Sequence, residues 1–242
     1  MRYLVISDVH SNYPALQTVL TNAAPFDAIL FLGDLVGYGP NPNECVERLQ
    51  EFPLTAIVGN HDWGVIGRAD LYVFNRDARQ ALLWTQREIY ADNRSFLTDL
   101  PTTVRIDDMM LAHGSPQEPI WEYLVDSYAA TENFMAHDFQ LAFVGHTHLP
   151  LIFEWEAQAE EAHLILPELE TPIEIGDRRL IVNPGSVGQP RDGDPRASYV
   201  IVDTEAQTLA YHRVPYPVEI TQERMRARGL PSRLIERLER GR

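Results

Sequence analysis

The sequence predicts an α/β fold that contains two β-sheets. Apolar runs of strand length alternate with helical patterns in the first half of the chain, which is typical of βαβ units. From about residue 102 onward, short apolar runs predominate with few helical patterns between them, which indicates a second sheet. The chain has 242 residues and is 45% hydrophobic, so it can bury one large core. We therefore expect a single domain over residues 1–242.

The predicted elements of the first half follow from hydrophobic periodicity. The first helix has clear start signals, since Asn12 can cap it and Pro14 suits its first turn. The pattern predicts strands at 3–7, 28–32 and 54–58, and helices at 14–23, 42–51 and 76–91.

The second half is richer in predicted strands. Two short paired strands are expected within 102–112, joined near Asp107 and Asp108, and a helix at 127–137. The remaining apolar runs predict strands at 141–145, 149–153, 179–183, 197–203 and 207–214.

Two segments have an unusual charge. Residues 154–177 carry eight acids and no arginine, which favours a solvated hairpin-like insertion over a docking surface for a basic partner. Residues 219–242 carry seven arginines and four acids. Ser232, as a cap, with the apolar residues after it, predicts a short packed helix in this C-terminal tail rather than a nucleic-acid-binding arm.

Composition excludes several classes of function. The net charge of −15 argues against a nucleic-acid polymer as partner, whereas a small phosphorylated substrate is compatible if bound cations reverse the local field. All 20 basic residues are arginine, so Schiff-base and P-loop lysine chemistry are excluded. The single cysteine, Cys45, lies in a helical pattern and is expected to be a small buried hydrophobe.

The chain has no apolar run long enough to span a membrane and no signal peptide ahead of its first strand. We therefore expect a cytoplasmic protein that does not bind membranes. The sequence is compatible with a homo-oligomer and gives no signal that tests it.

Polar side chains follow five predicted strands at the point where each strand ends. Because ligands in open α/β sheets bind outside the carboxyl ends of the strands, these groups are expected to meet. Imidazoles, carboxylates and an amide without thiolate suit Mn, Fe, Zn, Ni or Co, and their number suits two ions that share a carboxylate. Each fragment alone is commonly a turn, a cap or a loop histidine, and it is the complete set that indicates a metal site: Asp8 and His10; Gly33 and Asp34; Gly59, Asn60, His61 and Asp62; His113; and Gly145, His146 and His148.

In this order, the five fragments resemble the signature of calcineurin-like metallophosphoesterases. The resemblance covers residues 1 to about 203, and GDLVGYGPNPNECV and NPGSVGQPRDGDPRASY are similar to the compact bacterial and archaeal branch. It implies a four-layer α/β/β/α sandwich. It also implies two adjacent metal sites: Asp8, His10 and His148 at one; Asn60, His113 and His146 at the other; and Asp34 bridging them.

The resemblance further implies hydrolysis of small phosphomonoesters or phosphodiesters by attack of a metal-bridging hydroxide. His61 is the implied catalytic residue, either as the acid that protonates the leaving group or as an electrostatic stabiliser. The second motif here continues to Gly37, Tyr38 and Gly39, and it lacks the later Asp and Arg of phosphoprotein phosphatases. This departure argues against phosphoprotein or diadenosine tetraphosphate substrates.

Candidate substrate contacts lie beside these motifs. Arg191 is expected either to replace the missing phosphate-binding arginine or to form a surface ion pair with Asp192 or Asp194. Tyr38 and Trp63 suit stacking on a nucleobase or aryl group, with core packing as the alternative. Residues 183–186 are expected to form a turn that anchors the second sheet near the metals.

Two rival functions are weighed against the phosphoesterase. The first is a non-catalytic, metal-binding scaffold of the same fold. Such scaffolds tend to lose metal ligands or the catalytic histidine, whereas this sequence has all seven ligands and His61. The second is a nuclease of the same family, which the acidic charge and modest length disfavour.

Overall fold

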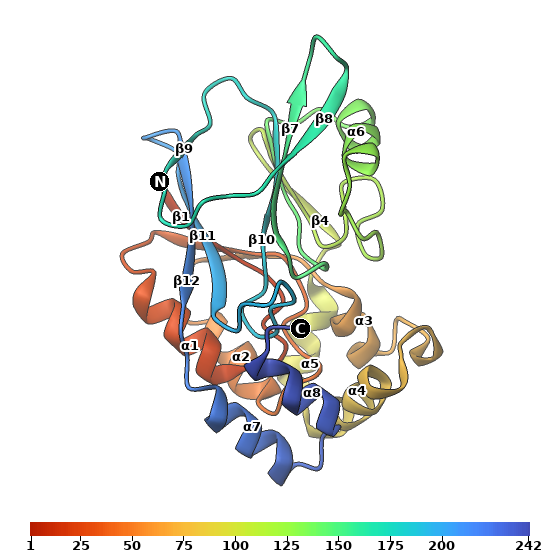
Figure 1. The fold of residues 1–242 in the computed structure, drawn as a ribbon. Coiled ribbons are helices and arrows are strands. Elements are labelled where there is room, and N and C mark those ends of the chain that lie inside the picture. Colours follow the sequence, from red (N-terminus) through yellow and green to blue (C-terminus); the bar gives the residue numbers. More distant parts are fainter.

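The computed structural model describes residues 1–242 and contains two mixed six-stranded sheets and eight α-helices. The two sheets lie face to face, most helices gather on one side of them, and helix α6 lies alone on the other side (Figure 1). This arrangement confirms the predicted four-layer α/β/β/α sandwich. No helix is both long and apolar enough to cross a membrane.

The first sheet combines three parallel strands with three antiparallel ones. Strand β1 pairs in parallel with β2, which pairs in parallel with β3, while β11 is antiparallel to β1. The spatial order is β3 (Leu54–Ala56), β2 (Ala28–Phe31), β1 (Arg2–Ile6), β11 (Ala197–Asp203), β12 (Thr208–Val214) and β9 (Ile173–Glu174).

The second sheet has the same mixed character. Strands β5, β6 and β10 are parallel, and β4, β7 and β8 are antiparallel to their neighbours. The spatial order is β4 (Thr103–Ile106), β5 (Met109–Ala112), β6 (Leu141–Phe143), β10 (Leu180–Pro184), β7 (Pro150–Glu156) and β8 (Glu161–Ile165).

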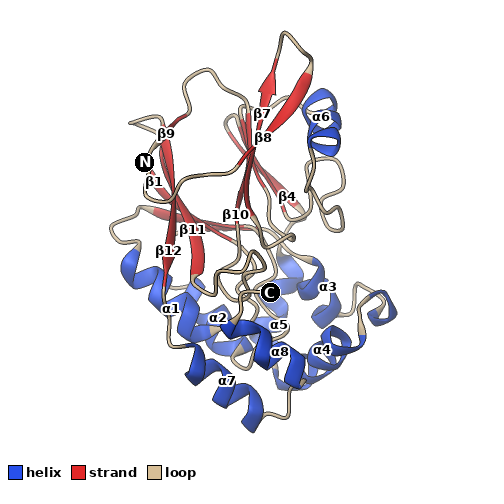
Figure 2. Ribbon diagram, viewed as in Figure 1, coloured by secondary structure: helices blue, strands red, loops and turns tan.

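The helices cover the two outer faces unequally (Figure 2). All helices except α6 bury side chains in one apolar cluster with Leu4, Ile6 and Phe31 of the first sheet. Helix α6 buries Ala130 and Phe134 against the outer face of the second sheet. The helices are α1 (Tyr13–Asn22), α2 (Pro42–Leu49), α3 (Asn60–Ile66), α4 (Arg76–Glu88), α5 (Ala91–Asp99), α6 (Ser127–Ala136), α7 (Val218–Ala227) and α8 (Ser232–Glu236), with single 3₁₀ turns at Leu71–Val73 and Arg237–Glu239.

A separate apolar core joins the facing sides of the two sheets. Val5 and Leu30 of the first sheet and Phe143 and Val182 of the second are fully buried in it. Because alternate residues of a strand point to opposite faces, each central strand serves this core and an outer core at once. This explains why the central strands read as continuous apolar runs in the sequence.

Three helices, α3, α5 and α7, were not predicted. Helix α3 begins directly after Gly59, and the carboxylate of Asp62, in its first turn, accepts the Gly59 N–H at 3.0 Å, which satisfies one of the free N–H groups at the helix start. The predicted helix 76–91 instead ends at Glu88. The N–H of Tyr90 donates to Asn43 Oδ1 at 2.9 Å, and this tertiary contact helps to separate α4 from α5.

The predicted helix caps have different outcomes. Asn12 caps α1 as predicted, since its Oδ1 accepts the N–H of Ala15 at 3.3 Å. Ser232 is the first residue of α8 rather than its cap, because Pro231 takes the cap position and no side chain bonds the first turn. Cys45 is fully buried in α2, as expected.

The acidic segment 154–177 belongs to both sheets. Its first part forms the β7–β8 hairpin, and Glu154 pairs with Arg178 through two hydrogen bonds of 2.6 and 2.7 Å. Its last part, β9, pairs with β12 of the other sheet. The segment therefore contributes strands to both sheets of the sandwich rather than only a solvated hairpin.

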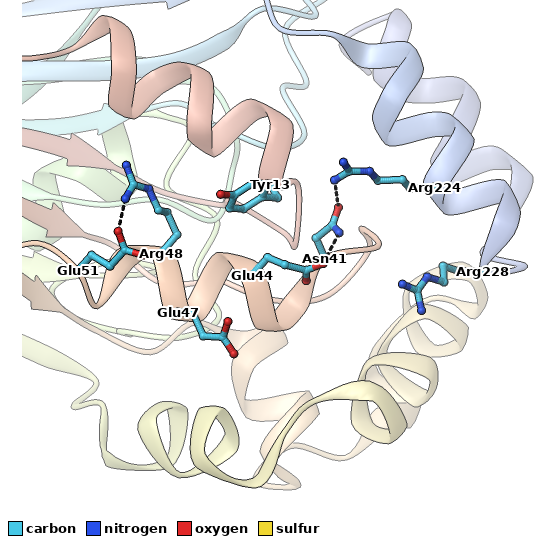
Figure 3. Close-up of a pocket in the computed structure, with 8 residues that line it drawn as sticks. All are labelled: Tyr13, Asn41, Glu44, Glu47, Arg48, Glu51, Arg224 and Arg228. Carbon is cyan, nitrogen blue, oxygen red and sulfur yellow. Dashed lines mark hydrogen bonds and ion pairs between the residues drawn. The ribbon is translucent and has the colours of Figure 1, made fainter.

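The C-terminal tail is joined to the helical layer. Figure 3 shows that Arg224 of α7 donates to Asn41 Oδ1 at 3.2 Å, and that Asn41 donates to Glu44 Oε1 at 2.8 Å. These contacts lie in a cavity of about 450 Å³ between α2 and α7. They fix α7 beside the N-terminus of α2.

Tyr211 links the two sheets, and its replacement by phenylalanine should lower the stability of the protein. Its buried hydroxyl, on β12, lies 2.9 Å from the carbonyl oxygen of Leu151 and 3.0 Å from that of Asn183, both on the second sheet. We expect Tyr211→Phe to lower the free energy of unfolding by about 1–2 kcal/mol, measured by urea denaturation. The matched control is Tyr199→Phe, since the Tyr199 hydroxyl makes no hydrogen bond; equal losses in both variants would contradict the link.

Candidate metal centre

Seven buried polar side chains meet at the carboxyl ends of five parallel strands. These strands, β1, β2 and β3 of the first sheet and β5 and β6 of the second, end where the two sheets approach each other, so their loops face a common space. Each side chain is at most 4% exposed: Asp8, His10, Asp34, Asn60, His113, His146 and His148.

The first group of ligands joins the loops that follow β1 and β6. Asp8 Oδ1 lies 3.2 Å from His148 Nε2 and 3.7 Å from His10 Nε2. The two imidazole Nε2 atoms lie 3.1 Å apart. The three ligand atoms therefore surround one point and could hold one metal ion.

The second group joins the loops that follow β2, β3, β5 and β6. His113 Nε2 lies 3.4 Å from Asp34 Oδ2 and 3.1 Å from Asn60 Oδ1. His146 also directs a ring nitrogen toward this group. Its buried Nε2 has no hydrogen-bond partner within the protein. This group could hold a second ion.

Asp34 connects the two groups. Its Oδ2 lies 3.4 Å from His113 Nε2 in the second group and 3.6 Å from His10 Nε2 in the first. A single carboxylate oxygen is thus within reach of both candidate metal positions. This is the placement required of a bridging ligand.

Backbone carbonyls set the tautomers of three histidines. The Nδ1 of His10, His113 and His148 lies 3.3, 2.8 and 2.5 Å from the carbonyl oxygens of Val36, Leu32 and Gln189, respectively. A carbonyl can only accept, so each Nδ1 carries a hydrogen, and each ring, when it is neutral, turns its Nε2 lone pair toward the centre.

The donor set fits two divalent cations. With both rings neutral, the lone pairs of His10 and His148 would face each other at 3.1 Å in a site that is almost fully buried. Such lone pairs repel unless a positive charge lies between them. Together with the unpartnered Asp8 Oδ1 and His146 Nε2, this geometry calls for cations. Imidazole, carboxylate and amide ligands suit transition metals such as Mn, Fe, Zn, Ni or Co.

Burial lowers the pKa of most of the imidazoles. It lowers the pKa of His10 and His148, and that of His146 to about 3, so these rings are neutral at pH 7. Burial alone would raise the pKa of Asp8 and Asp34, but the neighbouring imidazoles, His148 for Asp8 and His113 for Asp34, hold both pKa values below the usual range. The carboxylates are therefore ionised and available to a cation.

The backbone of five candidate metal-binding residues is strained, and this conformation directs their side chains toward the centre. Five ligands have positive φ angles: Asp8 (54°), His10 (47°), Asp34 (57°), His146 (65°) and His148 (61°). Such conformations cost of order 1 kcal/mol or more each and persist only where the surroundings enforce them. Here they are enforced by hydrogen bonds between the ligand loops, including His10 N–H to the carbonyl of Asp34 at 3.0 Å and His146 N–H to Asp8 Oδ2 at 3.1 Å.

Asp62 supports the centre without being a ligand. Its carboxylate accepts the N–H groups of Asp34, Val36 and Gly59 at 2.9, 3.0 and 3.0 Å. Burial and the charge of Asp34 raise the pKa of Asp62 to about 7. This residue ties the loop after β2 to the loop after β3. Its motif was noticed in the sequence, but this role in fixing the backbone was not anticipated.

His61 lies at the edge of the centre. Its ring is 4.9 Å from the ring of His10 and 4.3 Å from that of Tyr38, and its N–H donates to Asp34 Oδ1 at 2.8 Å. Its Nδ1 is buried beside Gly37 without a partner, which leaves Nε2 to face the open side. Burial lowers the pKa of His61 to about 4 in spite of the nearby charge of Asp34.

The structure places Arg191 beside the centre. Its Nη2 lies 3.5 Å from the Tyr38 hydroxyl and 3.2 Å from Gln189 Oε1, and its Nε is buried without a partner. The alternative of a surface ion pair is wrong, because Asp192 pairs with Arg213 and Asp194 with Arg196.

The other candidate contacts have structural roles. Tyr38 is 5% exposed and packs against His10 with a centroid distance of 4.6 Å, so it belongs to the wall of the site. Trp63 is partly buried in α3. In the predicted anchoring turn, Asn183 donates to the carbonyl of Gly145 at 2.7 Å, and Ser186 donates to that of Asp8 at 2.8 Å.

Two aromatic residues near the centre were not found by sequence reasoning. Tyr123 lies with its ring 4.0 Å from that of His146 and is 55% exposed. Trp121 packs against Phe74, whose ring is 5.0 Å from that of His61. Both belong to a loop without a recognisable motif. The density of aromatic residues in this loop was the only available signal.

Comparisons with known proteins agree with this geometry. Residues 1–207 match the calcineurin-like phosphoesterase superfamily domain, so the resemblance seen in the motifs is confirmed. An uncharacterized protein of Methanocaldococcus jannaschii is 40% identical over 245 residues, covering 98% of this chain and 97% of that protein.

Two solved structures cover the whole chain. A metallophosphoesterase from Sphaerobacter thermophilus is 45% identical with a TM-score of 0.92, over 100% of this chain and 99% of that one. A hypothetical protein from Pyrococcus horikoshii is 21% identical with a TM-score of 0.81, over 100% and 98% of the two chains, and shows a similar fold.

Gly145 allows the loop after β6 to approach Asp8, and an alanine there should weaken metal binding. A Cβ at this position would lie 2.0 Å from Ser7 Oγ and 3.0 Å from Asp8 Oδ2. We expect Gly145→Ala to lower metal affinity by about tenfold or more, measured by titration of the chelator-stripped protein. Adding Ser7→Ala removes the closest clash and should restore part of the affinity, with Ser7→Ala alone as the control. Unchanged affinity in Gly145→Ala would contradict this account.

His113 should be the one protonated imidazole of the metal-free centre at neutral pH. Burial opposes its charge, but the neighbouring Asp34 raises the pKa of His113 to about 9. Its proton is therefore lost only as the pH rises through that value, whereas His10, His146 and His148 are already neutral at pH 7.5. Among the histidines of the centre, nitrogen-15 NMR of the metal-free protein should show one doubly protonated ring, assigned with His113→Gln. A neutral His113 at pH 7.5 would contradict the prediction.

Proposed function

Because the chain belongs to the calcineurin-like phosphoesterase superfamily, we propose that it is a dinuclear-metal phosphoesterase that hydrolyses small phosphomonoesters or phosphodiesters. The observation that carries the proposal is the position of Asp34 Oδ2, within 3.6 Å of His10 Nε2 and 3.4 Å of His113 Nε2. One oxygen can thereby join two metal sites. A single structural ion would not need this arrangement.

The chain's own residues would hold the ions and fix their positions. When bound, the two divalent cations would polarise the phosphoryl oxygens and lower the pKa of a water molecule to near neutrality. The ligands are held for this by the Nδ1–carbonyl hydrogen bonds of the histidines and by the backbone contacts of Asp62. A site fixed in advance avoids reorganisation during the reaction.

In the proposed reaction, His61 acts on the leaving group. Its ring is neutral at pH 7 in the free protein because burial lowers its pKa. A bound phosphate ester adds negative charge nearby, which favours the protonated ring. His61 Nε2 would then give its proton to the leaving oxygen as the ester bond breaks. The neighbouring Phe74 and Tyr38 rings keep this imidazole in place.

Arg191 is the proposed phosphate contact. Its guanidinium lies beside Tyr38 and is not held by the acids that follow it in sequence. A guanidinium with unused donors binds phosphate oxygens well, often through two hydrogen bonds. Arg191 would thus do what the absent arginine of the second motif does in phosphoprotein phosphatases.

The rival proposal is a metal-binding scaffold without catalysis. All seven ligand positions and His61 carry residues that suit the reaction, and the ligands converge as a catalytic centre requires. We therefore favour the enzyme. Hydrolysis assays separate the two proposals.

The test is hydrolysis by chelator-stripped protein reloaded with Mn, Co, Ni, Zn or Mg. p-Nitrophenyl phosphate, its bis ester and a nucleotide panel serve as substrates. Asp34→Asn should abolish activity and reduce the bound metal. His61→Ala should lower kcat by about 10²–10⁴ on alkyl esters and by less on p-nitrophenyl esters, whose leaving group needs less protonation.

The matched control is His163→Ala, since His163 is a half-exposed histidine on β8 that pairs with Glu156. This variant should retain wild-type rates. Hydrolysis of no substrate with any metal would favour the scaffold. Full activity of His61→Ala on alkyl esters would overturn the role given to this residue.

A further inference from the structure

A second cavity, of about 740 Å³, lies between the start of α4 and the last ten residues of the chain. Its wall is strongly basic although the protein carries a net charge of −15. Two acids, Asp77 and Glu236, face five arginines: Arg76, Arg233, Arg237, Arg240 and Arg242. The cavity therefore has a positive field on an acidic molecule.

Most of these arginines have no acidic partner. Arg233 lies 4.0 Å from Asp77, and this is the one ion pair among the residues of the wall. Arg237 donates its Nε to the terminal main-chain oxygen of Arg242 and is thereby already partnered. Arg76 and Arg240 are exposed and approach no carboxylate side chain closely enough to form an ion pair. The positive charge of the wall is thus available to a ligand.

The arginines are presented by a fixed segment. Leu234 and Leu238 are 3% and 4% exposed and belong to the same apolar cluster as Tyr38 and Phe74. Beyond them, the carbonyl of Gly241 accepts the N–H of Gly193 at 2.8 Å. This hydrogen bond holds Arg240 and Arg242, on either side of Gly241, next to the loop that carries Arg191, and Figure 1 shows the C-terminus beside these loops.

The cavity adjoins the metal centre. Asn75 lines the cavity and follows Phe74, whose ring is 5.0 Å from that of His61. On the other side, Arg191 lies two residues before the Gly193 anchor and reaches Tyr38, whose ring is 4.3 Å from that of His61. Phe74, next to the cavity-lining Asn75, and Tyr38, which Arg191 reaches, therefore both contact the residue proposed to face the leaving group.

Resting on the proposed phosphoesterase function, we propose that this arginine-lined cavity binds a second phosphate group of the substrate. The substrate class is then a small phosphate ester with another phosphate on its leaving group, such as a nucleoside 3′,5′-bisphosphate. The leaving group lies on the His61 side, which is the side of the cavity. Guanidinium groups without acidic partners are well suited to a phosphate, which offers several acceptor oxygens.

The dimensions favour a small ligand over a polymer. The cavity falls within the roughly 300–1,000 Å³ of small-molecule sites. The chain as a whole carries a net charge of −15 and repels polyanions. A compact phosphate group therefore fits better than an extended nucleic acid.

The first experiment measures binding without the metals. Isothermal titration of chelator-stripped protein with inorganic pyrophosphate compares the wild type with Arg76→Gln/Arg240→Gln. Loss of charge-assisted hydrogen bonds should weaken binding by about tenfold or more. The control, Arg2→Gln/Arg105→Gln, removes two exposed arginines elsewhere and should bind like the wild type. Equal unfolding midpoints of all three proteins exclude a folding defect.

The second experiment uses the metal-loaded protein. Adenosine 3′,5′-bisphosphate is compared with adenosine 3′-monophosphate, and the ratio of their kcat/KM values is the readout. We expect a ratio above one that falls by about tenfold in Arg76→Gln/Arg240→Gln and is unchanged in the control.

The two experiments separate the subsite from the catalytic proposal. If the monophosphate is hydrolysed but neither pyrophosphate affinity nor the kcat/KM ratio depends on these arginines, the subsite is overturned and the phosphoesterase stands. If nothing is hydrolysed and the arginine variant alone loses pyrophosphate binding, the phosphoesterase fails and the cavity remains an anion site. Equal pyrophosphate binding by both double variants overturns the subsite whatever the activity.

Discussion

The carboxylate of Asp34 imposes the constraint on which the rest of the structure depends. It is 1% exposed and lies among the imidazoles of His10, His113 and His146. Burying such groups is unfavourable unless each finds a partner, and the protein supplies only part of the partners through backbone N–H groups. The two groups of ligand atoms could hold divalent cations, which would supply the rest. The ligand loops, their unusual φ angles and their mutual hydrogen bonds follow from this requirement.

The two-sheet architecture brings the candidate metal-ligating side chains together. Each sheet has a parallel group of strands, and the loops after both groups open on the same side. Short links then fix the loops to one another: Asp62 binds the backbone after β2, and Ser186 binds the carbonyl of Asp8. The ligands therefore depend on contacts between segments far apart in the sequence. The apolar core between the sheets keeps those segments in register.

The centre and the C-terminal tail beside it carry charges of opposite sign. The centre concentrates ionised carboxylates, while the C-terminal tail concentrates arginines beside it. The tail packs through Leu234 and Leu238 onto the apolar cluster that also contains Tyr38 and Phe74. It lies largely beyond the region that matches the superfamily domain, residues 1–207. The basic wall thus combines this tail with the first turn of α4, which lies inside the matched region.

The sequence by itself determined the fold class, most of the strands and the set of candidate metal-ligating side chains. Five apolar strands end at Asp8, Asp34, Asn60, His113 and His146, and although each ending alone is commonly a turn or a cap, the complete set is a signal that the sequence itself contains. Only the tertiary structure decided what depends on distant partners: that Asp34 Oδ2 reaches both groups, that Asn43 separates α4 from α5, and that Arg191 leaves its acidic neighbours for Tyr38. The same is true of the arginine cavity. Hydrophobic periodicity is a property of neighbouring residues, whereas side-chain direction and charge pairing are properties of the packed chain.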